Sequence, residues 1–129
     1  MVERIVLPPY DRYELSTFVV HDDVVYIGHI GGVNDEEGNI LTSIEEQMEQ
    51  TLKNLEEYLE EIDLDLENVV KLTVILKDIN DFKEMHKVWK RFFNEGNYPV
   101  RSVITSEFVN DNILVQVEGI ACVKGRSSK

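Results

Sequence analysis

The chain has 129 residues and a net charge of −12, from 25 acidic and 13 basic side chains. This length predicts a single domain over residues 1–129 with its own hydrophobic core. A surface this acidic repels phosphate backbones, which argues against nucleic acid as a partner. Cys122 is the one cysteine, and no apolar run approaches the roughly 18 residues that cross a bilayer. We therefore expect a cytoplasmic protein with no membrane partner and no internal disulfide.

Residues 123–129 are expected to form a flexible basic tail. Lys124, Arg126 and Lys129 lie there without an acid, whereas residues 1–123 hold 25 acids against 10 bases. Chain ends commonly fray into solvent, so we interpret the segment as a solvated end and not as a binding arm.

The first half of the chain predicts a hairpin followed by a helix. Leu15–Val20 and Val24–Ile30 are rich in β-branched and aromatic residues, and a turn-rich loop over 31–39 follows them. A helix should begin near Thr42 or Ser43, because both have a glutamate three residues later. Its buried stripe is spaced by three or four residues and consists of Ile44, Met48, Leu52, Leu55, Leu59 and Ile62. The glutamates of the opposite face are expected to be solvated and to bind no metal.

The second half predicts a strand, a helix and two more strands. Val69–Lys77 alternates, with Val70, Leu72, Val74 and Leu76 on one face. A second helix should be capped by Asn80 or Asp81, with an aromatic stripe interpreted as core and Gly96 at its C-cap. The last two strands are then Arg101–Ser106 and Ile113–Val123.

The last strand is apolar on both faces, which requires cover on both sides of the sheet. Two helices cover one face of a five-stranded sheet, so the other face should meet another subunit. The predicted fold is an α+β, β-β-α-β-α-β-β mixed sheet with two helices on one face.

Polar residues on the apolar strands are the candidates for chemistry. Gln116 and Glu118 share a face of the last strand. Burying an amide or a carboxylate there costs roughly several kcal/mol unless the group is paired. Arg101 offers a planar fork that matches a carboxylate. It either closes a subunit interface by pairing with a glutamate or binds a small carboxylate ligand there. The three histidines lack metal-ligand spacing, and Cys122 is expected to be inert core.

The same residues carry a resemblance to the reactive-intermediate-deaminase family (Rid, also called YjgF). The matching segments run in order over Tyr13 to Val123: Gln47…Thr51-Leu52-Lys53-Asn54-Leu55, Val69–Val74, Asp81-Phe82…Met85, Pro99-Val100-Arg101-Ser102 and Leu114–Ala121. The resemblance implies a chorismate-mutase-like subunit and a homotrimer with clefts between subunits. It implies hydrolysis of reactive enamines and imines to 2-oxo acids and ammonia, without a cofactor or metal.

The resemblance also assigns site residues. Arg101, beside Ser102, would hold the substrate carboxylate, and the family's water-orienting glutamate falls on Gln116, with Glu118 as a substitute on the same face. The family's Ser-Gly-Gln is Ile27-Gly28-His29 here. Two further substrate-binding positions are implied, which are Tyr13 in the pocket-tyrosine region and His86 in place of an asparagine.

Two functions follow as hypotheses. The first is a deaminase of 2-imino acids whose activity is weakened by Gln116, since an amide cannot take a proton at neutral pH. The alternative is a non-hydrolytic binder of small carboxylic acids. An endoribonuclease fits poorly with the charge of −12.

Overall fold

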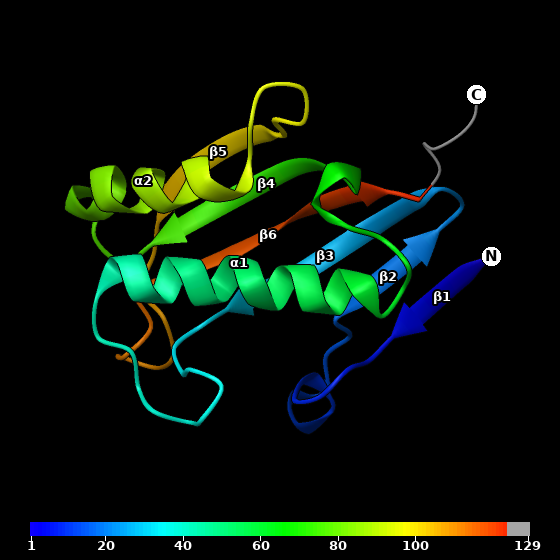
Figure 1. The fold of residues 1–129 in the computed structure, drawn as a ribbon. Helices are drawn as coiled ribbons and strands as arrows, with labels where there is room; N and C mark the ends of the chain where they lie inside the picture. Colours follow the sequence, from blue (N-terminus) through cyan, green and yellow to red (C-terminus); the bar gives the residue numbers. More distant parts are fainter. Residues whose placement is uncertain (124–129) are drawn as a thin grey trace.

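The computed structural model describes residues 1–123, so the predicted basic tail lies outside it except for Val123. It holds one six-stranded sheet and two α-helices (Figure 1). The strands are β1 (Val2–Ile5), β2 (Phe18–His21), β3 (Val24–Gly31), β4 (Val69–Leu76), β5 (Val100–Thr105) and β6 (Val115–Cys122). The helices are α1 (Ile44–Glu60) and α2 (Phe82–Phe92), with short 3-10 turns at Tyr10–Tyr13, Leu66–Asn68 and Ile79–Asp81.

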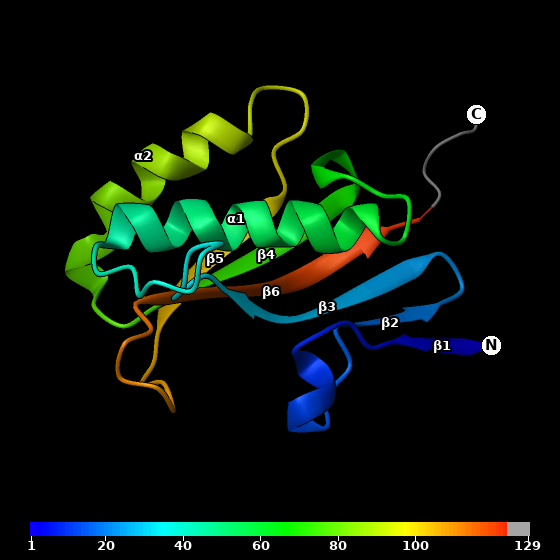
Figure 2. The ribbon, with the colours of Figure 1, turned by 60° about the horizontal axis from the view of Figure 1, so that its bottom comes forward.

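The sheet order is β1-β2-β3-β6-β4-β5, and every neighbouring pair is antiparallel except β4 and β5. α2 makes the crossover between these two parallel strands, and both helices cover one face of the sheet (Figure 2). The predicted mixed sheet is confirmed, with one additional strand. β1 was not predicted, because this four-residue edge strand buries only part of Ile5 and so lacks a clear apolar alternation.

The core lies between α1, α2 and the sheet, as the helical stripe predicts. Met48, Leu52, Leu55 and Leu59 are fully buried. Ser43 is the cap that begins α1, because its Oγ accepts from the Glu46 backbone N–H at 3.1 Å. None of the helices over residues 1–123 is both long and apolar enough to span a bilayer.

A β-bulge changes the predicted face of the first residues of β4. The pairing with β6 shifts between Val69 and Lys71, so Val69 enters the core while Val70 is 44% exposed. The inward position predicted for Val70 is therefore wrong. Gly119 lies at this bulge, and a Cβ there would stand 2.0 Å from the carbonyl oxygen of Lys71. Only glycine allows the two strands to approach this closely.

α2 begins after Asp81, as predicted, although no side chain caps its first turn. It ends at Phe92, and Phe93 occupies the C-cap position in an extended conformation. Gly96, predicted as the C-cap, instead lies in the following turn with a φ of +105°. The helix can end without it because Phe93 turns back into the core, where it is 2% exposed and packs on Trp89.

Candidate functional site

The Arg101 side chain lies on the helix-covered face of the sheet, at the edge strand β5. Arg101 is opposite Leu72 in the parallel β4–β5 pair, and Leu72 is buried in the core below the helices. Directly opposed residues point to the same face. Arg101 therefore extends toward α2, where Phe82, His86 and Trp89 lie one helical turn apart on one side.

We call these four residues, Arg101, His86, Phe82 and Trp89, the Arg101 cluster. The Arg101 Nη1 atom is 3.0 Å from Nδ1 of His86. The guanidinium carbon stands 4.7 Å from the centre of the Trp89 ring and 5.4 Å from that of Phe82. The rings of Phe82 and His86 are stacked, 5.7 Å apart and 8° from parallel. Cation–π contacts and one hydrogen bond thus orient the guanidinium.

No carboxylate of residues 1–123 forms an ion pair with Arg101. This is notable in a chain with 25 acids, because a partly buried cation is normally matched by an anion. Burial lowers the pKa of Arg101 from its ordinary value, although an arginine remains charged at any physiological pH. The cluster therefore presents a partly desolvated, oriented positive charge that no described carboxylate pairs with.

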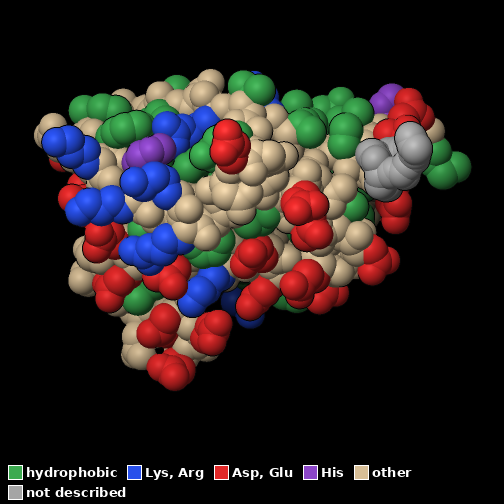
Figure 3. Space-filling model, turned by 45° about the horizontal axis from the view of Figure 1, so that its top comes forward, with side chains coloured by type: hydrophobic (Ala, Val, Ile, Leu, Met, Phe, Trp, Pro, Cys, Tyr) green, Lys and Arg blue, Asp and Glu red, His purple; other side chains and the backbone are tan. Residues whose placement is uncertain are grey.

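His86 has a lowered pKa, first because of burial and then because of the charges of Arg101 and Lys90. Basic side chains gather around a histidine over α2, whereas carboxylates spread over much of the rest of that face (Figure 3). α2 itself carries Lys83, Lys87, Lys90 and Arg91. The surroundings of the Arg101 cluster are thus locally basic on an acidic protein.

Gln116 and Glu118 lie on the opposite, uncovered face of the sheet. Gln116 is paired with Ile75 and Glu118 with Thr73, and both are partly buried. The shared face predicted for these two residues is confirmed. One subunit nevertheless does not bring them to Arg101, because the sheet itself separates them.

The remaining predicted site residues are dispersed over the subunit. Ser102 is exposed on the uncovered face, opposite Thr73. Gly28 and His29 lie on β3, separated from β5 by β6 and β4, which corresponds to about 14 Å at the usual strand spacing. Tyr13 is 64% exposed in the 3-10 turn that connects β1 and β2. A single subunit therefore holds the predicted site in separate parts.

Sequence reasoning missed the contacts that Phe82 and Trp89 make with Arg101. The sequence predicts both as core residues, and Trp89 is indeed only 4% exposed. Their spacing with His86, at i, i+4 and i+7, is the signal that places all three on one helix face. Cys122, predicted as inert core, is in fact partly exposed on the uncovered face of the sheet.

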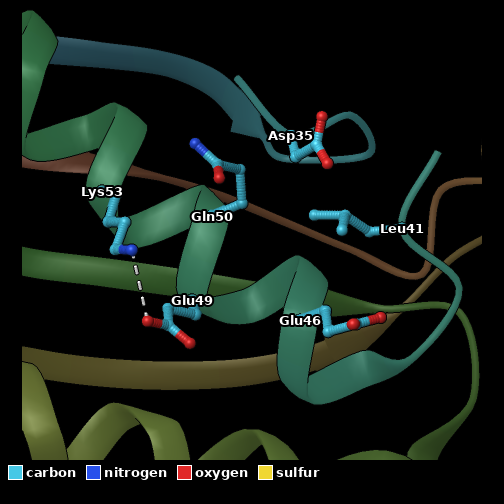
Figure 4. A pocket seen from close by; sticks show the side chains of 6 residues that line it. All are labelled: Asp35, Leu41, Glu46, Glu49, Gln50 and Lys53. Atoms are coloured by element: carbon cyan, nitrogen blue, oxygen red, sulfur yellow. Dashed lines mark ion pairs between the residues drawn. The ribbon is translucent and has the colours of Figure 1, made fainter. Parts of the chain in front are cut away.

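A shallow hollow between the loop at Asp35 and α1 contains none of these residues (Figure 4). Within it Lys53 pairs with Glu49 at 3.3 Å. Nowhere in residues 1–123 do three potential metal ligands converge. The Arg101 cluster is thus the better candidate for ligand binding.

The sequence profile described as Endoribonuclease L-PSP matches residues 7–123. The chain belongs to this family, also known as YjgF or Rid. It is 32% identical over 107 residues to the human 2-iminobutanoate/2-iminopropanoate deaminase, covering 82% of this chain and 77% of the relative.

Solved structures of the family share the fold. A member of the YjgF family from Neisseria meningitidis superposes with a TM-score of 0.82 at 19% identity, over 99% of this chain and 98% of the other. A yjgF-family protein from Streptococcus pyogenes gives a TM-score of 0.77 at 27% identity, over 94% and 95%. The predicted chorismate-mutase-like α+β subunit is confirmed.

Proposed function

We propose that this protein binds the carboxylate of a small 2-imino or 2-oxo acid at Arg101 and hydrolyses 2-imino acids to 2-oxo acids and ammonia. The observation that carries the proposal is the oriented guanidinium of Arg101 without an acidic partner. The relatives named as 2-iminobutanoate/2-iminopropanoate deaminases supply the reaction class. A planar guanidinium binds a carboxylate through two parallel hydrogen bonds, so the carboxylate end of such a substrate fits this group.

The reaction asks little of the protein beyond orientation and proton movement. Water adds across the C=N bond, so that its oxygen bonds to the imine carbon and one of its protons passes to the nitrogen. The hydroxyl proton of the resulting carbinolamine then passes to the nitrogen as the C–N bond breaks, which leaves the 2-oxo acid and ammonia. Arg101 would hold the substrate, and an amide at Gln116 would hold the water by hydrogen bonds. Because Gln116 cannot exchange a proton, part of the roughly 10²–10⁴-fold effect of a general acid–base should be missing. Glu118 offers a carboxylate on the same face, two residues along β6.

We infer that the working assembly is a homotrimer in which the site is completed between subunits. The uncovered sheet face exposes large apolar side chains, with Tyr26 48%, Ile104 49% and Val100 67% exposed. A monomer rarely leaves such a face open. Because Gln116 and Arg101 lie on opposite faces, a second copy at the β5 edge is the arrangement in which both can meet one ligand.

The alternative function is non-hydrolytic binding of small carboxylic acids, which Gln116 favours because it removes the expected proton carrier. Endoribonuclease activity is not proposed, since the net charge of −12 opposes binding to RNA. We also expect residues 1–129 to form a single domain and the protein to be cytoplasmic. The location is suggested by Cys122, the one cysteine, because a lone thiol suits a reducing compartment.

The test compares wild type with Arg101→Ala and Gln116→Glu. 2-Iminobutanoate is generated in situ from threonine by a dehydratase, and 2-oxobutanoate release is followed above the spontaneous rate. Arg101→Ala should weaken 2-oxobutanoate binding about 100-fold, as expected for loss of a charged partner. Gln116→Glu should raise turnover by about tenfold or more.

The outcomes separate the hypotheses. Unchanged binding by Arg101→Ala in calorimetry would contradict the carboxylate site. If binding depends on Arg101 but neither wild type nor Gln116→Glu turns over the substrate, the result would support the alternative function, non-hydrolytic binding. A fast wild type that Gln116→Glu leaves unchanged would place the proton carrier elsewhere, with Glu118 and His29 to be substituted next.

A further inference from the structure

The contact between Arg101 and His86 determines where the imidazole carries its proton. Arginine has five N–H donors and no acceptor. At 3.0 Å from Nη1 of Arg101, Nδ1 of His86 must therefore accept the hydrogen bond. An accepting Nδ1 is unprotonated, so the ring proton lies on Nε2 and the imidazole is neutral.

The orientation of the guanidinium depends on this neutral ring. Arg101 is on the edge strand β5, and its long side chain has many rotamers to lose. The aromatic faces of Trp89 and Phe82 limit its position, but stacking leaves rotation within the plane. The hydrogen bond to His86, itself stacked on Phe82, restricts that rotation and leaves the other N–H groups for a ligand.

The charges that face His86 favour its neutral form. Arg101 approaches from β5, and Lys83 and Lys90 lie within one turn on α2 itself. The only acid of α2, Glu84, pairs with Lys87 at 3.2 Å. The α1 carboxylate of Glu49 reaches α2 and pairs with Arg91. No carboxylate from the packed elements in residues 1–123 is thus paired with the imidazole, and its pKa is lowered.

We propose that His86 is a positioning residue that holds the Arg101 guanidinium for carboxylate binding, and that it does so only as a neutral acceptor. This inference rests on the proposed function of Arg101. Protonation of His86 replaces the acceptor with a donor and places two cations 3.0 Å apart. Ligand affinity should then be full above the pKa of His86 and should fall as the pH falls through it.

The test is calorimetry with 2-oxobutanoate as the probe, whose carboxylate stays ionised throughout, between about pH 5 and pH 8. His86→Asn keeps an acceptor oxygen near the position of Nδ1, whereas His86→Leu keeps the bulk without an acceptor. We expect His86→Leu to lose about tenfold in affinity, the effect of one charge-assisted hydrogen bond. His86→Asn should recover most of that affinity and remove the pH dependence. His21→Asn, in the β2–β3 hairpin, is the histidine control and should behave as wild type.

Several results would overturn the proposal. Affinity that rises toward acid pH would make protonated His86 a direct ligand of the carboxylate. Equal affinities for His86→Asn and His86→Leu would reduce the residue to a spacer. Nitrogen NMR of the ring that finds the proton on Nδ1 would contradict the hydrogen bond itself, and this needs no variant. Arg101→Ala, measured in parallel, separates the role of Arg101 from that of His86. If Arg101→Ala still binds 2-oxobutanoate, the proposed function is wrong. If Arg101→Ala loses binding but the His86 variants bind as wild type does, only the positioning role of His86 is wrong.

Discussion

Gln47 links α1 to the start of β6, and its substitution by glutamate gives a strong test of the buried hydrogen-bond network. The side chain is fully buried. Its Nε2 donates to the carbonyl oxygens of Leu41 at 2.9 Å and Asn112 at 2.7 Å, while its Oε1 accepts from the backbone N–H of Leu114 at 2.8 Å. One amide therefore satisfies three backbone groups from two loops.

Gln47→Glu keeps the shape but removes both donors. The carbonyls of Leu41 and Asn112 would then face a second oxygen, and each buried acceptor left without a partner costs about 1–3 kcal/mol. We expect the free energy of unfolding to fall by about 3–5 kcal/mol, from a total of roughly 5–15 kcal/mol for a domain. Urea unfolding followed by circular dichroism measures the change.

Gln50→Glu is the matched control on the same helix, because Gln50 is only partly buried and donates to one side chain, that of Asn54, at 2.9 Å. It should cost less than about 0.5 kcal/mol. Burial raises the folded-state pKa of the new carboxyl at position 47 above its unfolded value of about 4.3. The extra loss should therefore be small below that pH and should grow as the pH rises toward the folded pKa. A cost within 1 kcal/mol of the control at about pH 7 would refute the reasoning.

Three other predictions follow from the fold. Gly119→Ala should destabilise the protein by about 3 kcal/mol or more, because its Cβ would meet the backbone oxygen of Lys71. Gly31→Ala should be tolerated better in thermal melts, because its nearest contact is the flexible side chain of Gln116 at 3.3 Å. Asp35 accepts a hydrogen bond from the backbone N–H of Asn39 at 2.8 Å, and this bond lowers the pKa of Asp35. Asp35→Ala should speed hydrogen exchange at the Asn39 amide. In wild type, the same loss of protection should occur only when the pH falls below the ordinary aspartate pKa of about 3.9. Light scattering at micromolar concentration should give a trimer, and a monomer would contradict the proposed assembly.

Local patterns in the sequence determined most of the elements and their faces, with the exceptions of β1 and the bulged start of β4. Glutamates three residues after Thr42 and Ser43 limited the start of α1 to these two positions, of which the structure uses Ser43. Period-two alternation identified the two-sided strand β6 with Gln116 and Glu118 together. Such features depend on neighbours within a few residues, where the helical and strand periods hold regardless of the rest of the fold. The family resemblance could be recognised for the same reason, since its motifs are contiguous.

The tertiary structure alone decided which parts of the candidate site meet. Arg101 points to the helices because β5 pairs with β4 in a register that sets it opposite Leu72, and a shift of one residue would have turned it to the other face. The contact with His86 spans fifteen residues across the crossover. The bulge at Val69 likewise depends on the approach of Gly119 from a distant strand. Pairing register and strand approach are non-local quantities, so no pattern along the chain contains them.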